Sequence, residues 1–192
     1  MRTHSGSSII LLGALSAALG CQQAPKTART PVERGEYLVT TMGCNDCHTP
    51  WKLGPKGPEP DMSRMLSGHP EAMGQVAVPQ GNCGAWGIQG TLTMTAWSGP
   101  WGVSYAANLT PDEETGIGAW GENTFIKAMR TGKVMGGGRP ILPPMPWNWY
   151  ARLSDADLKA IFAYLQSIPP ITNHVPEPIL NPQPAPGAPA KK

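Results

Sequence analysis

Apolar residues recur at helical spacing in two parts of the second half of the chain. The clearer stripe follows the i, i+3, i+4, i+7 pattern of an amphipathic helix and consists of Leu158, Ile161, Phe162 and Leu165. Ser154 suits the cap of this helix, which is predicted to end before Pro169-Pro170. A shorter stripe of Phe125, Ala128 and Met129 predicts a second helix, which Gly132 closes.

A third helix, near the start of the chain, is predicted from the signals at its two ends. The run Thr30-Pro31-Val32-Glu33 combines a cap residue, a proline in the first turn and a capping-box glutamate. The helix is expected to run to about Met42, and Gly43 ends it. Because Gly35 is costly inside a helix, we expect another helix to cross closely at that position.

Residues 51–107 show no sustained period. Gly54-Pro55, Gly57-Pro58 and Glu59-Pro60 break any regular pattern, so this stretch is predicted to be rich in loops. Within it, residues 91–97 alternate polar and apolar side chains, which predicts one arm of a small β-hairpin. A loop of this length is uncommon without a function. We refer to residues 51–107 as the insertion.

Composition narrows the class of protein. A chain of 192 residues allows one domain of modest size. The 23 glycines and 22 prolines exceed ordinary usage without a repeat, so much of the chain is expected to be loop. A formal net charge of +2 argues against nucleic acid as a partner, which would require a concentrated basic face. Residues 174–192, rich in proline and alanine, predict an extended tail with no core of its own.

Residues 1–20 have the pattern of an export signal. Arg2 and His4 precede an apolar run over residues 9–15 that is too short to span a bilayer. Residues 17–21 resemble a bacterial lipoprotein cleavage site, which predicts a lipid on Cys21; ordinary cleavage near Gly20 is the alternative. Residues 21–30 would form a tether. The mature protein is therefore expected to be periplasmic or outer-facing and held at a membrane by the lipid.

The run Cys44-Asn45-Asp46-Cys47-His48 has the spacing that attaches a c-type haem. The two cysteines bond covalently to the haem, and His48 reaches the iron from one face. A thioredoxin-like redox pair also uses Cys-x-x-Cys but belongs in a βαβ context, which is missing here. A zinc site would need two further ligands close together, whereas Cys83, His69 and His174 are scattered along the chain.

A sixth iron ligand is predicted in the stretch 139–147. Pro143, Pro144 and Pro146 surround Met145 and hold its thioether in a stiff loop. The competing methionines beyond His48 lack such a loop, and they are Met62, Met65, Met94, Met129 and Met135. Met129 belongs to an apolar helix face and is interpreted as a core residue.

Two further residues with metal-binding side chains receive structural interpretations. His69 lies in Ser67-Gly68-His69-Pro70, which favours a turn over an iron ligand. Cys83 has no predicted partner and is interpreted as a small buried residue, with an intermolecular disulfide as the alternative.

The haem motif, the proline-flanked methionine and the closing helix occur in the order seen in class I c-type cytochromes. More narrowly, residues 108–120 and 139–170 resemble monohaem cytochromes related to the cytochrome subunits of bacterial quinohaemoprotein dehydrogenases. The resemblance covers roughly residues 31–170. It implies that Cys44, Cys47, His48 and Met145 bind the haem and that His48 and Met145 bind the iron. It also implies that Gly35 faces Tyr164 and that Asn108 and Trp120 lie near the haem edge or propionates.

Taken together, these features predict a mostly α-helical protein with the class I cytochrome c fold over residues 31–173, interrupted by the insertion. The expected function is an electron carrier with one covalently attached haem c and no catalytic residues of its own. A dehydrogenase or terminal oxidase is the expected redox partner. Two alternatives stay open: a subunit of a periplasmic dehydrogenase complex, and a ligand-sensing or catalytic haem protein whose sixth ligand is displaceable.

Overall fold

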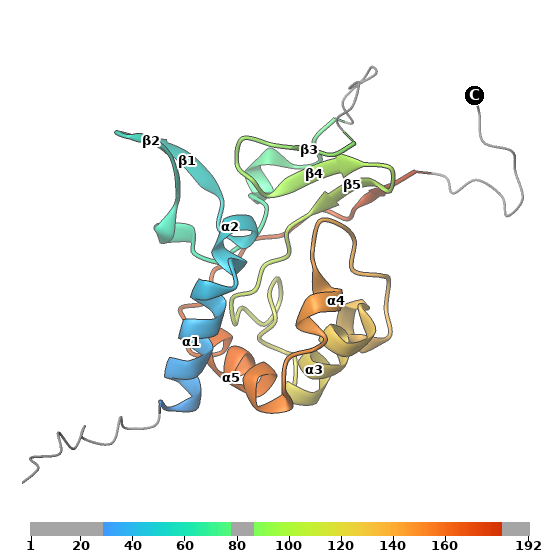
Figure 1. The fold of residues 1–192 in the computed structure, drawn as a ribbon. Coiled ribbons are helices and arrows are strands. Elements are labelled where there is room, and N and C mark those ends of the chain that lie inside the picture. Colours follow the sequence, from blue (N-terminus) through green and yellow to red (C-terminus); the bar gives the residue numbers. More distant parts are fainter. Residues whose placement is uncertain (1–28, 78–86, 182–192) are drawn as a thin grey trace, which may run out of the picture.

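The computed structural model describes residues 29–77 and 87–181, and Figure 1 shows that they form a helical region and a region of strands. The helices are α1 (Pro31–Thr41), α2 (Cys44–His48), α3 (Glu122–Thr131), α4 (Trp147–Tyr150) and α5 (Asp155–Leu165). Three short 3-10 helices lie at Met62–Arg64, Glu71–Met73 and Val134–Gly136. The three helices predicted from the sequence are confirmed as α1, α3 and α5.

The caps of these helices explain where they begin and end. Thr30 caps α1 and makes a complete capping box with Glu33. Ser154 accepts from the backbone N–H of Asp157 at the start of α5. Gly132 ends α3 in the left-handed conformation, with φ of 63°.

Helices α1 and α5 cross closely at Gly35. A methyl group added there would overlap the backbone carbonyl of Ala160 and lie 2.7 Å from Cβ of Tyr164. Only a glycine therefore permits this approach, and the predicted close crossing is confirmed, with Tyr164 at the contact. An ion pair between Arg34 and Asp157, with a 3.0 Å separation, joins the same two helices.

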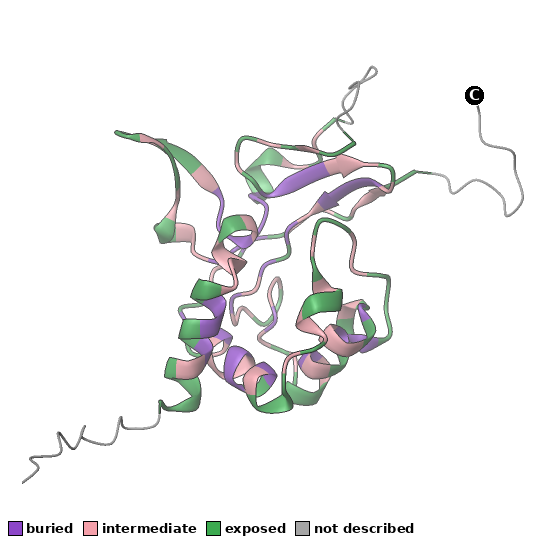
Figure 2. Ribbon diagram, in the orientation of Figure 1, coloured by how far each residue is buried: buried purple, intermediate pink, exposed green. Residues whose placement is uncertain are grey.

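The apolar core lies where α1, α3 and α5 meet, and purple segments of these helices face one another in Figure 2. Its buried members include Leu38, Val39, Phe125, Leu158, Ile161 and Leu165. The insertion contributes Leu66, whose side chain is completely buried, to the same cluster. The core therefore forms between elements far apart in sequence and leaves the polar helix faces exposed.

The insertion contains more regular structure than its sequence predicts. Strands β1 (Trp51–Gly54) and β2 (Gly57–Pro60) form one antiparallel hairpin. Strands β3 (Gln89–Gly90), β4 (Ala96–Gly99), β5 (Gly102–Tyr105) and β6 (Ile179–Leu180) form a second, four-stranded antiparallel sheet in that order. In Figure 1 this sheet lies above the helical region.

The predicted hairpin arm over residues 91–97 is displaced. Residues 91–94 form a turn, in which the N–H of Met94 donates to the carbonyl of Thr91, and the strand begins only at Ala96. The side chains of Thr91, Thr93 and Thr95 hydrogen-bond to one another at 3.0 and 2.8 Å, and Met94 has a φ of 54°. Local hydroxyl contacts therefore replace the ladder that the alternation suggested.

The chain after α5 does not leave the body of the protein at His174. Asn173 is buried, and its side-chain amide donates to the carbonyls of Ser67 and His69 at 2.7 and 2.8 Å. Residues 179 and 180 then pair with β5 as β6. The described part of the predicted tail, residues 174–181, therefore contacts the insertion, which its composition did not indicate.

Some of the predicted features lie outside the described ranges. These are the export signal over residues 1–20, the lipid on Cys21, most of the tether, Cys83, and the tail beyond residue 181. Within residues 29–77 and 87–181, no helix has the length and apolar character needed to cross a membrane.

Candidate functional site

The short helix α2 presents the haem motif. Gly43 adopts the left-handed conformation, with φ of 72°, between α1 and α2, and so turns the chain into the motif. Residues three and four apart share one face of a helix, so Cys44 lies on the same side as Cys47 and His48. All three line one cavity.

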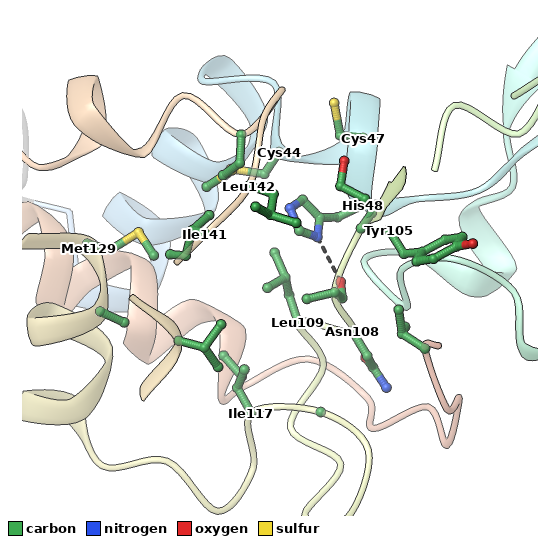
Figure 3. Close-up of a pocket in the computed structure, with 18 of the residues that line it drawn as sticks. Cys44, Cys47, His48, Tyr105, Asn108, Leu109, Ile117, Met129, Ile141 and Leu142 are labelled. Carbon is green, nitrogen blue, oxygen red and sulfur yellow. Dashed lines mark hydrogen bonds between the residues drawn. The ribbon is translucent and has the colours of Figure 1, made fainter. Parts of the chain in front are cut away.

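His48 is held in one tautomer by the insertion. Its side chain is buried, and Nδ1 lies 2.8 Å from the carbonyl oxygen of Ala107, which Figure 3 draws as a dashed line. Because a carbonyl can only accept, Nδ1 carries the proton and Nε2 keeps its lone pair. Burial lowers the pKa of His48, although the Ala107 carbonyl opposes that change. The imidazole is therefore neutral and able to ligate a metal at neutral pH.

The cavity has a volume of about 420 Å³ and a mostly apolar wall. Figure 3 shows Leu109, Ile117, Ile141 and Leu142 around it, with His48 among them. This wall includes side chains from α1, α3 and α5, from the insertion, and from residues 174–178. Such a cavity suits a large planar apolar cofactor whose iron meets the free nitrogen of His48.

The two thiols do not have the character of a redox pair. Burial raises the pKa of Cys44 to about 11, and the pKa of Cys47 is also raised, by burial and by the nearby Asp46 carboxylate. A redox Cys-x-x-Cys pair instead has a lowered pKa at its reactive thiol. The described residues also contain no group of three or more histidine, cysteine or acidic side chains able to hold a metal ion, so the zinc alternative lacks support there.

Among the residues that the structure describes, three methionines line the cavity, and Met145 is one of them. The other two are Met42, at the end of α1, and Met129, whose side chain in Figure 3 extends from α3 towards the cavity. The other four competing methionines named from the sequence lie elsewhere: Met62, Met94 and Met135 are exposed, and Met65 packs on the apolar core. The structure therefore brings Met145 to the site but places Met129 on the same wall.

Asn108 lies on the cavity wall, but its amide is occupied. Its nitrogen donates to Thr115 and to the carbonyl of Ile171, and its oxygen accepts from the backbone and hydroxyl of Thr110. The amide thus fixes the turn after the insertion, and all of its strong hydrogen-bonding positions are used. Asn108 and Trp120 both line the cavity, but the Asn108 amide has no donor left for a propionate.

His69 sits in a loop, as predicted, and does not line the cavity. Its Nδ1 lies 2.9 Å from the Thr95 hydroxyl, and its Nε2 lies 3.1 Å from the carbonyl oxygen of Gly74. Both ring nitrogens are therefore engaged within the insertion. This occupancy agrees with a structural role for a buried imidazole rather than with iron ligation.

Sequence reasoning missed the groups that hold the site in place. The carbonyl of Ala107 could not be singled out, because every residue has one. Tyr150 donates from its hydroxyl to the carbonyl of Met42 at 2.9 Å and so ties α4 to the chain just before the motif. Burial raises the pKa of Tyr150 to about 12, so this donor keeps its proton at neutral pH.

Comparisons with known proteins point to one group. The chain is 35% identical over 156 residues to the gluconate 2-dehydrogenase cytochrome c subunit of Pantoea cypripedii, which covers 81% of this chain and 26% of that protein. It is 29% identical over 153 residues to the cytochrome c subunit of the quinone alcohol dehydrogenase of Gluconobacter oxydans, covering 80% and 24%. The chain is related to these cytochrome c subunits. The resemblance expected from the sequence is thereby confirmed.

The relationship has a defined extent. The chain spans about a quarter of the length of those cytochrome relatives. It also matches one of the subunits of the nicotinate dehydrogenase of Pseudomonas putida at 38% identity over 105 residues, which is 55% of this chain and 8% of that protein. No protein-family model matches the chain.

Proposed function

We propose that this protein is an exported c-type cytochrome that transfers single electrons through one covalently attached haem. Cys44 and Cys47 would hold the haem, and His48 and Met145 would bind its iron from the two faces. Haem supplies a one-electron couple at its iron when bound. The residues 31–173 would then form a class I cytochrome c fold in which the insertion is an elaboration.

The observation that carries this proposal is the state of His48. Its Nδ1 proton is bound to the Ala107 carbonyl, and its Nε2 has no hydrogen-bond partner among the described residues. His48 lines a mostly apolar cavity, and both thiols and Met145 line the same cavity. A histidine ligand oriented by a carbonyl is the usual arrangement at iron and zinc sites.

The chain's own residues would do three things for the cofactor. The apolar wall excludes water from the ring, the protonated thiols of Cys44 and Cys47 offer two points of covalent attachment on one helix face, and Tyr150 fixes the approach to that helix. Methionine opposite histidine stabilises the ferrous state relative to a second histidine and so raises the reduction potential.

Attachment is tested by acid-acetone extraction of the purified protein. Haem should stay with the polypeptide, because thioether bonds survive loss of the iron ligands, and iron analysis should give one atom per chain. A variant with both Cys44→Ala and Cys47→Ala should release its haem. Extraction of haem from the unmodified protein would refute covalent attachment.

Axial ligation is tested by comparing two methionines of the same cavity wall. Met145→Ala should abolish the ferric sulfur-to-iron band near the red end of the visible spectrum and lower the reduction potential. Met129→Ala and the exposed Met94→Ala should keep the band. Loss of the band in Met129→Ala alone would assign the ligand to α3 and contradict the proposal.

The relatives' names favour a more specific role as the electron-transfer subunit of a dehydrogenase. Each of the three compared proteins is named as a subunit of a dehydrogenase. A dehydrogenase catalytic subunit is therefore the proposed electron donor, with a terminal oxidase or another redox protein as acceptor. Stable co-purification of a larger catalytic subunit with the tagged chain from its native cell would support this role, and recovery of the chain alone would argue for a free carrier.

We further propose that the protein is periplasmic or outer-facing and is anchored to a membrane by a lipid on Cys21. The support for this location is the sequence pattern of residues 1–21. Cys21→Ser should move the protein from the membrane fraction to the soluble fraction. If the variant remains in the membrane fraction, a protein partner holds it there instead.

A further inference from the structure

Strand β5 of the insertion makes a hydrogen bond to the loop of Met145. Ser104 is buried, and its hydroxyl lies 2.5 Å from the carbonyl oxygen of Pro143, much closer than the 3.5 Å to the carbonyl oxygen of Trp97. The indole Nε1 of Trp101 lies 3.2 Å from the same hydroxyl. Because an indole N–H can only donate, it points at Ser104 Oγ, and the single hydroxyl proton of Ser104 is free to be donated to Pro143. The two hydrogen bonds therefore run in one direction: Trp101 donates to Ser104, and Ser104 donates to the loop.

The Met145 loop needs such a donor because its prolines remove backbone N–H groups. Pro143, Pro144 and Pro146 have no backbone N–H to donate, and the N–H of Met145 donates within the loop itself, to the carbonyl of Leu142 at 3.3 Å. Hydrogen bonds from outside to this part of the loop therefore depend on its carbonyl groups. The other end of the loop is fixed separately, where the N–H of Ile141 donates to the carbonyl of Gly132 at 2.7 Å. The Ser104 hydroxyl is therefore the contact that fixes the loop two residues before the thioether.

The same strand also leads to the contact on the histidine side. Ala107, three residues after Ser104, supplies the carbonyl that accepts from His48 Nδ1. One extended segment, residues 102–108, therefore contacts both the histidine and the methionine loop. His48 lies 59 positions from Ala107 in the sequence, and Pro143 lies 39 positions from Ser104, so the segment links two distant parts of the chain.

We propose that Trp101 and Ser104 are positioning residues that hold the Met145 thioether in place, and that this is a function of the insertion. The inference rests on the proposed ligation of iron by Met145. Without the Ser104 hydroxyl the loop should open more often. A ligand that competes with Met145 for the iron would then show a lower apparent dissociation constant, because its apparent affinity increases with the fraction of molecules whose loop is open.

The test is a titration of the ferric holoprotein with imidazole, followed by the visible spectrum. Ser104→Ala should lower the apparent dissociation constant about five- to tenfold, the effect of losing one hydrogen bond that favours the closed loop. Trp101→Phe keeps an aromatic ring but removes the N–H donor, and it should shift the constant in the same direction by a smaller factor. Ser104→Thr keeps a hydroxyl in a strand position and should restore the unmodified value.

Ser98→Ala is the matched control, since Ser98 lies in the neighbouring strand β4 and faces the other side of the sheet. It should leave the imidazole constant unchanged. Equal shifts of the imidazole dissociation constant in Ser98→Ala and Ser104→Ala would refute the positioning role. The role is also refuted if Ser104→Thr does not keep the unmodified constant and Trp101→Phe has no effect on it. If the ferric sulfur-to-iron band survives in Met145→Ala, both the ligation by Met145 and this inference are wrong. If that band is lost, ligation by Met145 stands, and the serine variants test the positioning role alone.

Discussion

The helical region and the insertion are built on different physical principles. Helices α1, α3 and α5 are specified by caps, turns and apolar spacing within each segment, and they pack through a buried core. The insertion has short strands, and it is tied to the rest of the chain by hydrogen bonds from side chains such as Asn173 and Ser104. The first region forms the body of the site, while the second fixes the groups that face it.

In the proposed cytochrome, this difference would separate the attachment of the haem from the positioning of its iron ligands. The haem motif follows directly from the end of α1, so its position depends on the helical core. The orientation of His48 depends on a carbonyl of the insertion, and we propose that the Met145 loop depends on a hydroxyl of the insertion. Changes in the two regions should therefore have different consequences: loss of folding in the first, and altered ligand behaviour or local stability in the second.

The largest expected effect breaks the helical region at its closest contact. Gly35→Ala places a methyl group against the Ala160 carbonyl, which can move only if α1 and α5 separate. We expect a loss of about 3 kcal/mol or more in the free energy of unfolding, measured by denaturant titration of the holoprotein.

Gly121→Ala is the control for that variant, because a methyl group there meets no atom within 4 Å and the backbone is extended. Its effect should stay within about 1 kcal/mol. Equal destabilisation by the two substitutions would show that the crossing at Gly35 is not the cause.

A second variant breaks the joint between the insertion and the C-terminal segment. The oxygen of the Asn173 side chain accepts from Arg64 and from the N–H of Glu71, and its nitrogen donates to two carbonyl groups. Asn173→Ala leaves buried groups without partners and should cost about 2–3 kcal/mol in denaturant titration. Asn148→Ala, at an exposed position of α4, should be nearly neutral, and a comparable cost there would contradict this assignment.

A third prediction concerns pH and the buried imidazole of the insertion. Burial lowers the pKa of His69, although the Gly74 carbonyl opposes that change. At pH values near and below 6.5, His69 therefore binds a proton more readily in the unfolded chain than in the folded protein. The free energy of unfolding should fall as the pH drops below about 6.5. His69→Asn should flatten this fall, by at most about 1.4 kcal/mol per pH unit, in unfolding titrations between pH 5 and 7.

The same substitution at exposed His174 provides the comparison. If His174→Asn flattens the pH dependence as much as His69→Asn, burial of His69 is not responsible. The measured quantity is the slope rather than the stability at one pH, since either substitution also changes local packing.

The smallest expected effect concerns a local signal of the helical region. Thr30→Ala removes the hydroxyl that accepts from the N–H of Glu33 at 3.2 Å. A cost of about 1 kcal/mol in thermal or denaturant unfolding is expected. Thr40→Ala, at an exposed position of the same helix, should be neutral or slightly stabilising because alanine favours helices. Equal losses from both variants would show that the loss at Thr30 does not come from the cap.

Local patterns made the helical region predictable. The capping box at Thr30, the stripe of α5 and the glycines at 43 and 132 each act within a few residues, so they can be recognised without knowing the fold. Even the crossing at Gly35 could be inferred, because glycine destabilises the interior of a helix and is expected there only where another backbone packs closely. The candidate site shared this advantage where Cys44, Cys47 and His48 form one contiguous motif.

The insertion resisted prediction because its contacts are distant and generic. The alternation over residues 91–97 indicated a strand, but threonine hydroxyls formed local bonds instead and moved the strand to Ala96. The proline-rich start of the tail pairs with β5, which composition cannot show. A carbonyl such as that of Ala107 has no sequence signature at all, so the group that orients His48 became visible only in the structure.

We propose that protein ligands close both faces of a covalently bound haem iron and that the insertion holds these ligands in place. The most direct measurement is the visible spectrum of the purified ferrous protein before and after addition of carbon monoxide. We expect a low-spin spectrum that carbon monoxide leaves unchanged, because His48 and Met145 would both be bound to the iron. Ready binding of carbon monoxide, with a shift of the main absorption bands, would contradict it and favour a ligand-sensing or catalytic haem protein.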